Sequence, residues 1–486
     1  MNSYLISSIV VYMLAMIFIG YYAYKRTSSH SDYMLGGRGL TPGVAALSAG
    51  ASDMSGWLLM GLPGAIFDEG FRASWIAIGL ALGAYINWLY VAPRLRTFTE
   101  VANNSITIPG YFENRFEDKS RKLRIFSSLI ILIFFTSYVA SGMVAGGVLF
   151  NEILGYSYTT GVIVLVGVTL IYTLVGGFLA VSWTDVVQGL IMMTALILVP
   201  IVTLITIGGP NEVVSEVRAI DPSMLNVFTG MSAVGIISFL GWGLGYFGQP
   251  HIIVRFMALT SSKGAKKARH IGMSWMIISL VGAVLTGLIG FSYYSQQGMN
   301  ISDPETIFIQ LGTILFHPII TGFILAALLA AVMSTISSQL LVTSSSLTDD
   351  LYKTFFRRAA SERELVLVGR LSVLAVTGIA LGIAWVQPGS ILDMVSYAWA
   401  GFGASFGPVV LLSLFWSRMN TSGAVAGIIS GAVTVVLWSA LGASEVLYEL
   451  IPGFAVSTIM VYAISLITAP PSKQVVDQFN KVKELS

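Results

Sequence analysis

The sequence predicts an all-α polytopic membrane protein that forms a single domain over residues 1–486. Hydrophobic residues make up 55% of the chain and charged residues only 10%, whereas soluble proteins usually carry about 25% charged residues. Thirteen apolar segments are long enough to cross a bilayer, which takes about 20 helical residues. The Lys and Arg residues between these segments alternate as expected for a single orientation.

The predicted spans follow the apolar runs of the sequence in order. They cover residues 4–24, 42–66, 73–93, 125–150, 160–180, 184–207, 230–250, 272–294, 316–346, 366–386, 391–416, 422–441 and 451–468. The first run is longer than the core of a signal peptide and ends in Lys25 and Arg26 instead of a small-residue cleavage site. We therefore expect it to be a retained span.

The distribution of basic residues indicates the topology. With the N-terminus outside, 24 of the 26 Lys and Arg residues fall on the cytoplasmic side, and only Arg72 and Arg218 lie outside. Adding or removing one span would destroy this alternation, because cytoplasmic loops hold the positive charge. The sequence thus predicts an external N-terminus and a cytoplasmic C-terminal tail at 469–486.

Composition and missing motifs exclude several classes of function. The net charge of +2 gives no clustered basic face for nucleic acid. The chain contains no Cys, which excludes disulfides, thiolate metal sites and thiol catalysis. A GxxxxGK[ST] phosphate loop, an HExxH motif and a nucleophile elbow are also missing. We therefore expect no enzyme and no ATP-driven pump, and we predict no obligatory protein partner, only the lipid bilayer.

Two predicted spans are interrupted at corresponding positions. The second span contains Gly50 to Gly56, and the seventh contains Gly241 to Pro250 with four glycines and a proline. Paired interruptions of this kind are typical of transporters built from inverted repeats. The second break lies five spans after the first, and five is odd, so the broken spans cross in opposite directions. Residues 42–207 (spans 2–6) and 230–416 (spans 7–11) then form two inverted five-helix repeats, with 4–24 and 422–468 peripheral.

The first break places a carboxylate and hydroxyls at membrane depth. The carbonyls of Ala51 and Met54 and the side chains of Asp53 and Ser55 are candidate ligands for a cation such as sodium, because interrupted helices expose backbone carbonyls and hard cations prefer oxygen. The alternative is a kinked structural helix in which Asp53 bonds a neighbour. Intramembrane carboxylates are more often functional.

The ninth span offers hydroxyl groups that complete such a shell. Ser334 and Ser338 share one helix face, and Ala331 lies one turn before Ser334 and Thr335. In the alternative interpretation these small residues only allow close helix packing.

Aromatic and charged residues add further candidates. Tyr138, Trp242 and Tyr246 could form an aromatic wall against the apolar body of a small solute, although aromatics in membranes are often interface anchors or packing. Asp185 is either the N-cap of span six or part of an ion exit path. Arg38 could pair with a carboxylate in a gate.

The most distinctive stretches resemble the sodium/solute symporter family. They are Leu35–Arg38, Ala46–Gly64, Gly176–Asp185, Gly241–His251, Ala330–Thr335 and Ser396–Ala404. The likeness covers nearly the whole chain and is greatest to the bacterial members that carry proline. It is weaker in the external loops at 208–229 and 295–315 and in the tail.

The resemblance implies an inverted-repeat fold and a set of site residues. It implies sodium bound by Ala51, Met54, Ala331, Ser334 and Thr335, with Asp53, Ser55 and Gly56 important for ion coupling and Asp185 for ion release. It places Tyr138, Trp242, Tyr246 and Pro250 near the substrate and Arg38 in cytoplasmic gating. The expected function is alternating-access symport of L-proline with one sodium ion into the cell, across a bacterial plasma membrane.

Two alternatives stay open from the sequence. The nearer is a sodium-coupled carrier for another small solute, such as pantothenate, a monocarboxylate or a sugar. The other is a channel or membrane sensor on the same scaffold. The lack of a signalling module after Pro471 disfavours a sensor.

Overall fold

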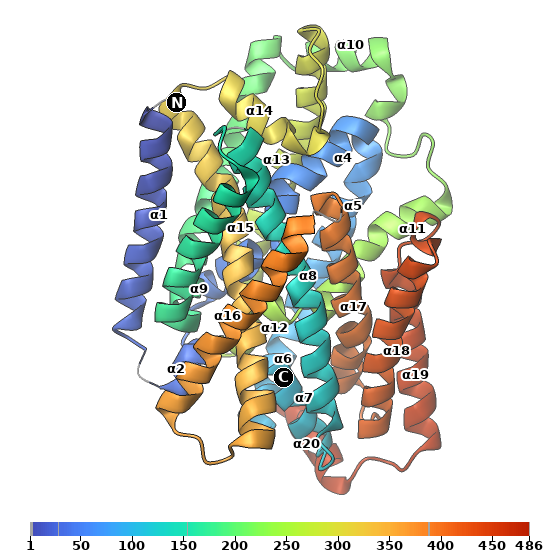
Figure 1. Ribbon diagram of the computed structural model, residues 1–486. Helices are drawn as coiled ribbons and strands as arrows, with labels where there is room; N and C mark the ends of the chain where they lie inside the picture. The colour runs from blue at the N-terminus through green and yellow to red at the C-terminus, as the bar shows by residue number, and fades with distance from the viewer. Residues whose placement is uncertain (1–2, 28, 153, 387–388, 486) are drawn as a thin grey trace.

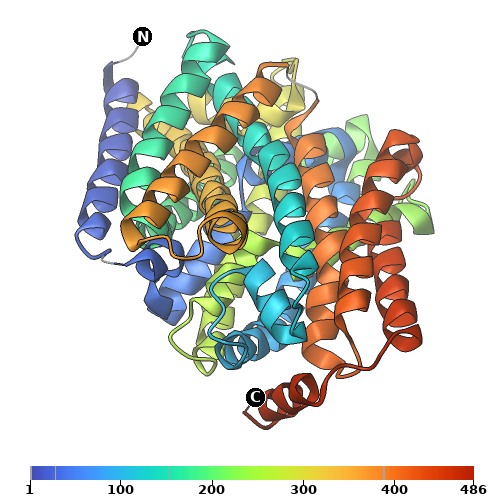
Figure 2. The same cartoon turned by 60° about the horizontal axis from the view of Figure 1, so that its bottom comes forward.

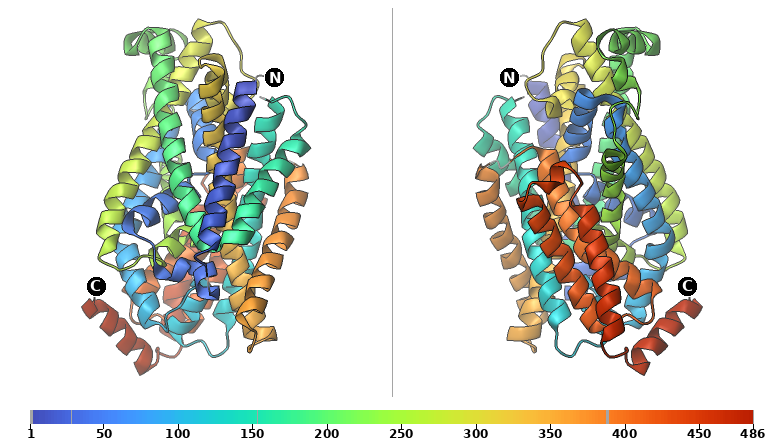
Figure 3. Two further views of the ribbon diagram at one scale, coloured as in Figure 1. Left: turned by 90° about the vertical axis from the view of Figure 1, so that its left-hand side faces the viewer. Right: turned by 90° about the vertical axis from the view of Figure 1, so that its right-hand side faces the viewer.

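The computed structural model describes residues 3–27, 29–152, 154–386 and 389–485, and this part of the chain is helical apart from short connections. Within it, ten helical stretches are long and apolar enough to cross a membrane. They pack side by side into one elongated bundle (Figures 1 and 3). The fold is therefore that of an all-helical polytopic membrane protein.

Most of the predicted spans coincide with single helices. These are α1 (Ser3–Tyr24), α8 (Lys122–Glu152), α13 (Gly264–Gln296), α16 (Glu362–Val386), α17 (Ile391–Phe415), α18 (Thr421–Ala440) and α19 (Leu450–Ile467). α15 (Pro318–Ser345) continues into the π-helix η8 (Ser346–Phe356). In α15 every residue from Ile324 to Ser345 is buried, so this helix lies in the core of the bundle.

Residues predicted as spans five and six form the two helical arms of α9 (Tyr158–Ile207), which meet at a break without an intervening loop. α9 has 50 residues and changes direction at Gly177, whose φ of 60° and ψ of −152° are not helical. Glycine tolerates this backbone geometry, which residues with a Cβ rarely adopt. A Cβ at Gly177 would also lie 2.6 Å from the Tyr33 ring.

The second predicted span is broken, as expected. α3 (Pro42–Asp53) ends at Met54, and the chain resumes as the π-helix η2 (Trp57–Gly61) and α4 (Leu62–Glu69). The 3₁₀ turn η3 (Gly70–Ala73) leads into α5 (Ser74–Ile86), the π-helix η4 (Asn87–Val91) and α6 (Ala92–Val101). Single π-turns inside helices are frequent at functional sites.

The seventh predicted span is also broken. α11 (Ala233–Gly241) gives way to the 3₁₀ segment η6 (Trp242–Gly248), and α12 (Pro250–Met257) begins after the extended residue Gln249. The backbones of α5 and η6 are in contact, because a Cβ at Gly83 would lie 2.1 Å from the carbonyl oxygen of Gly243. Glycine at both positions permits this approach.

Short helices lie at the two ends of the bundle (Figures 1 and 2). The end at the top of Figure 1, here the α10 end, carries α10 (Pro210–Ile220), η5 (Pro222–Leu225), η7 (Pro304–Thr306) and α14 (Ile307–Ile314). The opposite α20 end carries α2 (His30–Leu35), η1 (Gly36–Arg38), α7 (Ile108–Phe116) and α20 (Lys473–Leu485). η9 (Ala443–Glu445) connects α18 to α19. α1 and the α18–α19 pair lie at opposite edges of the bundle in Figure 1.

Candidate ion and solute site

Buried oxygen atoms from α3 and α15 converge beside the first break. The Ser334 hydroxyl donates to the carbonyl oxygen of Ala51 at 2.7 Å and lies 3.0 Å from that of Ala331. The Thr335 hydroxyl lies 3.1 Å from the Ala331 carbonyl. Met54, the fifth predicted ligand, ends α3 with φ −78° and ψ 78°. These oxygen donors fit the chemistry that a hard cation such as sodium requires.

Asp53 joins the first break to the second. The Tyr246 phenol in η6 donates to Asp53 Oδ2. The backbone carbonyl of Asp53 accepts from the Trp57 indole at 3.2 Å and from the Tyr138 hydroxyl at 3.5 Å. Two of the predicted aromatics therefore bond Asp53, Tyr246 at the carboxylate and Tyr138 at the backbone carbonyl, and the residue is 2% exposed.

The other residues predicted near the break have different contacts. Trp242 stacks on Tyr448 with ring centroids 5.2 Å apart, and its carbonyl accepts from the Trp399 indole at 2.8 Å. Pro250 is buried at the start of α12, where its missing N–H costs no helical hydrogen bond. Gly56 lets η2 approach α8, because a Cβ there would lie 3.0 Å from the Cβ of Ala145.

Asp185 belongs to a buried ionic cluster. It lies within the unbroken part of α9, so the prediction that it caps a helix is wrong; the chain turns earlier, at Gly177. Its Oδ2 accepts from the Ser48 hydroxyl at 2.6 Å and from Arg255 Nη2 at 3.2 Å. The same Nη2 also donates to Ser338 Oγ at 2.6 Å. Residues from α3, α9, α12 and α15 thus meet at one ion pair.

Sequence reasoning missed the role of Arg255. The charge pattern assigns this residue to the basic residues that set topology, but Arg255 is 1% exposed and lies inside the protein. The signal that could have found it is the position of an arginine only five residues after Pro250, directly after the apolar run Ile252–Val254.

Arg38 links several segments at the α20 end of the bundle. Its guanidinium donates to Asn104 Oδ1 at 2.8 Å, to Thr99 Oγ1 at 3.2 Å, and to the carbonyls of Met257 and Ser105 at 2.7 Å each. The expected carboxylate partner is replaced by amide, hydroxyl and carbonyl oxygens. Burial, and then the charge of Arg96, lowers the pKa of Arg38 to about 10, so the side chain stays charged at neutral pH.

Backbone hydrogen bonds also link segments at the α20 end. The Leu40 N–H donates to the carbonyl of Ala258 at 3.1 Å, and the Thr260 N–H donates to the carbonyl of Leu40 at 3.1 Å. Arg96 Nε donates to the carbonyl of Leu259 at 2.6 Å. The segments before α3 and after α12 are therefore held together at the α20 end.

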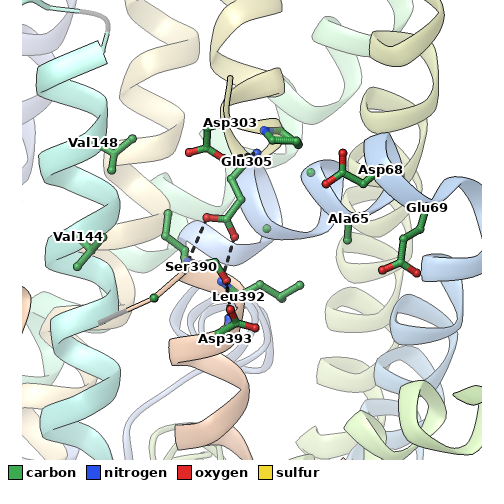
Figure 4. A pocket seen from close by; sticks show the side chains of 15 residues that line it. Ala65, Asp68, Glu69, Val144, Val148, Asp303, Glu305, Ser390, Leu392 and Asp393 are labelled. Carbon is green, nitrogen blue, oxygen red and sulfur yellow. Dashed lines mark hydrogen bonds between the residues drawn. The ribbon is translucent and has the colours of Figure 1, made fainter. Parts of the chain in front are cut away.

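The α10 end contains an open, acidic cavity of about 650 Å³. Figure 4 shows Glu305 pointing into it toward the start of α17. Its carboxylate accepts from the backbone N–H groups of Ile391 and Leu392 at 3.1 Å each. The acidic residues that line the cavity are Asp68, Glu69, Asp303, Glu305 and Asp393, and none of the lining residues that the structure describes is Lys or Arg. Such a cavity raises the local concentration of cations.

Beside Asp53 the bundle is nearly closed. The cavity there measures about 20 Å³ and is lined by Asp53, Asn87 and Tyr246 among apolar residues of α3, α5 and α13. This volume holds about one water molecule. The large acidic cavity lies at the α10 end, and the contacts of Arg38 lie at the α20 end.

Sequence comparison identifies the family. The profile of the sodium:solute symporter family matches residues 33–431. The chain belongs to this family. The matched range includes the interrupted segments and every predicted site residue of the symporter.

Curated members of the symporter family are similar to the chain over nearly its full length. The high-affinity proline transporter PutP of Bacillus subtilis is 66% identical over 469 residues, 96% of this chain and 99% of the relative. The osmoregulated proline transporter OpuE of the same organism is 54% identical over 487 residues, which are 100% of this chain and 99% of the relative. A sodium/proline symporter of Staphylococcus aureus is 51% identical over 488 residues, with 98% and 95% covered.

Solved structures support the fold of this symporter. A Na⁺-coupled sialic acid symporter in a substrate-bound outward-open state has a TM-score of 0.83 at 22% identity and covers 97% of this chain and 99% of its own. The nucleobase-cation-symport-1 transporter Mhp1 in a closed conformation has a TM-score of 0.57 at 15% identity and covers 92% and 98%. At these identities the likeness concerns the fold alone.

Proposed function

We propose that this symporter carries L-proline into the cell together with sodium, one ion per proline, by alternating access. The observation that carries the proposal is the 66% identity to the proline transporter PutP over 96% of the chain. The buried, ordered site around the first break supports it, because broken helices at membrane depth persist only where protein surrounds them.

Sodium binds at the oxygen cluster of α3 and α15 in this proposal. The ligands are the carbonyls of Ala51, Met54 and Ala331 and the hydroxyls of Ser334 and Thr335. The short distance from Ser334 Oγ to the Ala51 carbonyl supports this assignment, since both atoms can turn to one cation between the helices. Because α3 is broken and α15 is continuous, the ion fixes the position of one against the other.

Proline binds on the aromatic side of Asp53. Tyr138 and Tyr246 both reach Asp53, and Trp242 and Pro250 belong to the same break as Tyr246. Ser55 and Gly56 form the turn between α3 and η2, and both are buried. Proline therefore meets residues whose position depends on the ion, which is how one ligand can raise the affinity for the other.

The finer architecture follows from the same elements. We propose thirteen spans, with α9 supplying two and the broken segments one each, and two inverted repeats at 42–207 and 230–416. α1 and the α18–α19 pair are peripheral. The α10 end faces outward and the α20 end faces the cytoplasm of a bacterial cell, because the basic residues gather on the α20 side.

Alternating access uses the two ends in turn. The acidic cavity at the α10 end admits sodium and proline, while Arg38 and the Leu40 pairing close the cytoplasmic side. Release requires these contacts to open. Asp185 lies between the ion cluster and the cytoplasmic side, and its bonds to Arg255 and Ser48 are the contacts that an exiting ion meets.

The ion gradient supplies the free energy. Proline is a zwitterion, so each cycle moves one net charge, worth about 2.3 kcal/mol per 100 mV. A tenfold sodium gradient adds about 1.4 kcal/mol. Together these terms sustain accumulation of proline by several hundredfold.

Uptake into proteoliposomes tests the proposal. Labelled proline should accumulate only with an inward sodium gradient, and unlabelled proline on the inside should drive counterflow, which a channel cannot support. Competition by pantothenate, monocarboxylates and sugars separates proline from another solute. Proline entry that persists without sodium would refute the ion assignment, and inhibition by another solute but not by proline would refute the substrate.

A further inference from the structure

Asn87 lies between the two broken helices. It is the first residue of η4, and its side chain is fully buried. Its Nδ2 donates to the carbonyl oxygen of Tyr246 at 2.9 Å. Asn87 is thus bonded directly to η6, the unwound part of the second break.

Asn87 and Asp53 each carry a buried oxygen atom and line the same small cavity. Asn87 Oδ1 and Asp53 Oδ1 are both buried and have no hydrogen-bond partner among the residues that the structure describes. Both side chains line the cavity of about 20 Å³, together with Tyr246. Buried polar atoms nearly always have partners, either protein or ordered water.

One water molecule fits both the volume and the chemistry of this cavity. A site of about 10–15 Å³ already holds a water, and a water can donate one hydrogen to each of two acceptor oxygens. A cation is less suitable, because hard cations take about six oxygen ligands and most of the other residues lining the cavity are apolar.

Such a water would close a ring of interactions. The Tyr246 phenol already donates to Asp53 Oδ2, and the Tyr246 carbonyl accepts from Asn87. A water between Asp53 Oδ1 and Asn87 Oδ1 connects the remaining two atoms. Both ends of Tyr246 would then be held, one by the first break directly and one through Asn87.

We propose that one buried water bridges Asp53 and Asn87, and that Asn87 is a positioning residue that couples the first break to the second. Because α5 and η6 already touch through Gly83 and Gly243, Asn87 moves with η6. A shift of α3 when sodium binds is therefore passed to Tyr246. This role rests on the proposed sodium-coupled binding of proline.

A density map of the full-length protein at a resolution that shows ordered water tests the bridge without any transport assay. We expect one peak within hydrogen-bond distance of Asp53 Oδ1 and Asn87 Oδ1. A map that shows no peak there, or a peak with the short, multiple oxygen contacts of a metal ion, would overturn the bridge.

Equilibrium binding of labelled proline, with and without sodium, tests the coupling. In Asn87→Leu we expect the increase in proline affinity caused by sodium to fall at least tenfold, while proline affinity without sodium changes less than threefold. Asn87→Ala leaves room for further water and provides a second variant if Asn87→Leu misfolds. Thr286→Val is the control, since this buried hydroxyl in α13 bonds only its own helix at Gly282.

The outcomes separate the inference from the proposed function. If wild-type protein shows no sodium-stimulated binding of proline, the proposed function fails, and the map alone decides whether the water is present. If sodium raises the proline affinity of both Asn87 variants by the same factor as that of the wild type, the coupling role of Asn87 is wrong. If the Asn87 variants bind proline more weakly by the same factor with and without sodium, the coupling role is also contradicted.

Discussion

The hydroxyl oxygen of Ser334 lies 2.7 Å from the carbonyl oxygen of Ala51, and this contact joins the continuous helix α15 to the end of the broken helix α3. The two residues are 283 positions apart in the chain. Both are fully buried, so the contact lies inside the protein and not at a lipid-facing surface.

Replacement of Ser334 by alanine tests the proposed sodium ligand. We expect Ser334→Ala to raise the sodium concentration for half-maximal proline uptake at least tenfold, because one oxygen ligand is lost, with each tenfold change equal to about 1.4 kcal/mol. Uptake at varied sodium concentration gives this value. Thr343→Val is the control, because its hydroxyl bonds only the Gln339 carbonyl of the same helix. If Ser334→Ala and Thr343→Val require the same sodium concentration for half-maximal uptake, Ser334 is not a sodium ligand.

The buried ion pair of Arg255 and Asp185 should be sensitive to loss of one partner. Arg255→Met leaves a buried carboxylate unpaired, which typically costs about 3–5 kcal/mol. We expect a clear fall in the melting temperature of the purified protein. Adding Asp185→Leu removes the orphaned charge and should recover much of the stability without restoring transport. A double variant no more stable than Arg255→Met would argue against this pairing.

Glu305 should make the α10 end sensitive to pH. Burial raises its pKa above the ordinary value, and the N–H groups of Ile391 and Leu392 only partly oppose the shift. The folded state therefore favours the protonated carboxyl. The stabilising effect is complete below the unfolded pKa of about 4.3 and is lost as pH rises through the raised, folded pKa.

Glu305→Gln isolates this effect, because glutamine is always neutral and keeps one acceptor oxygen. Between pH 4.5 and 7 we expect the melting temperature of the wild type to decline relative to that of Glu305→Gln. If the melting temperatures of the two proteins change with pH in parallel over this range, the pKa of Glu305 is not raised in the folded protein.

Arg38 can be tested with a thiol probe, since the chain contains no cysteine. A single Ile106→Cys places a reporter beside the Ser105 carbonyl that Arg38 binds. Arg38→Lys loses the forked geometry that reaches four acceptors, because lysine donates from one atom. We expect faster maleimide labelling from the cytoplasmic side. Sodium and proline should change the rate less in Arg38→Lys than in its parent, and unchanged labelling would exclude a role in closure.

Phe479 should hold the C-terminal helix in place. Its ring lies near the guanidinium groups of Arg94 and Arg115, at 5.3 and 5.5 Å, and it is 7% exposed. Removing a buried Phe side chain costs about 3–5 kcal/mol, so Phe479→Ala should release α20 and speed its proteolysis. Asn480→Ala changes the exposed face of α20 and should leave its rate of proteolysis unchanged. Equal protection in both variants would show that α20 is held by other contacts.

The sequence by itself determined the helical class, the positions of the two breaks and most residues around them. Apolar length and charge alternation are local properties, and a cluster of glycine and proline residues within a short segment is a local signal for a broken helix. For the same reason Asp53, Ser334 and Tyr246 could be recognised as unusual within apolar segments. The function assigned to them depended on the resemblance to a family as well as on their chemistry.

The tertiary structure alone decided which of these residues meet. The helical arms of α9 meet at Gly177, so Asp185 lies inside the second arm and not at its start. Arg255 lies against that carboxylate, and Asn87 lies between the breaks. Helical periodicity fixes the face on which a residue lies, but not which distant face packs against it. That pairing depends on side-chain shape and on the cost of leaving a buried charge or carbonyl without a partner.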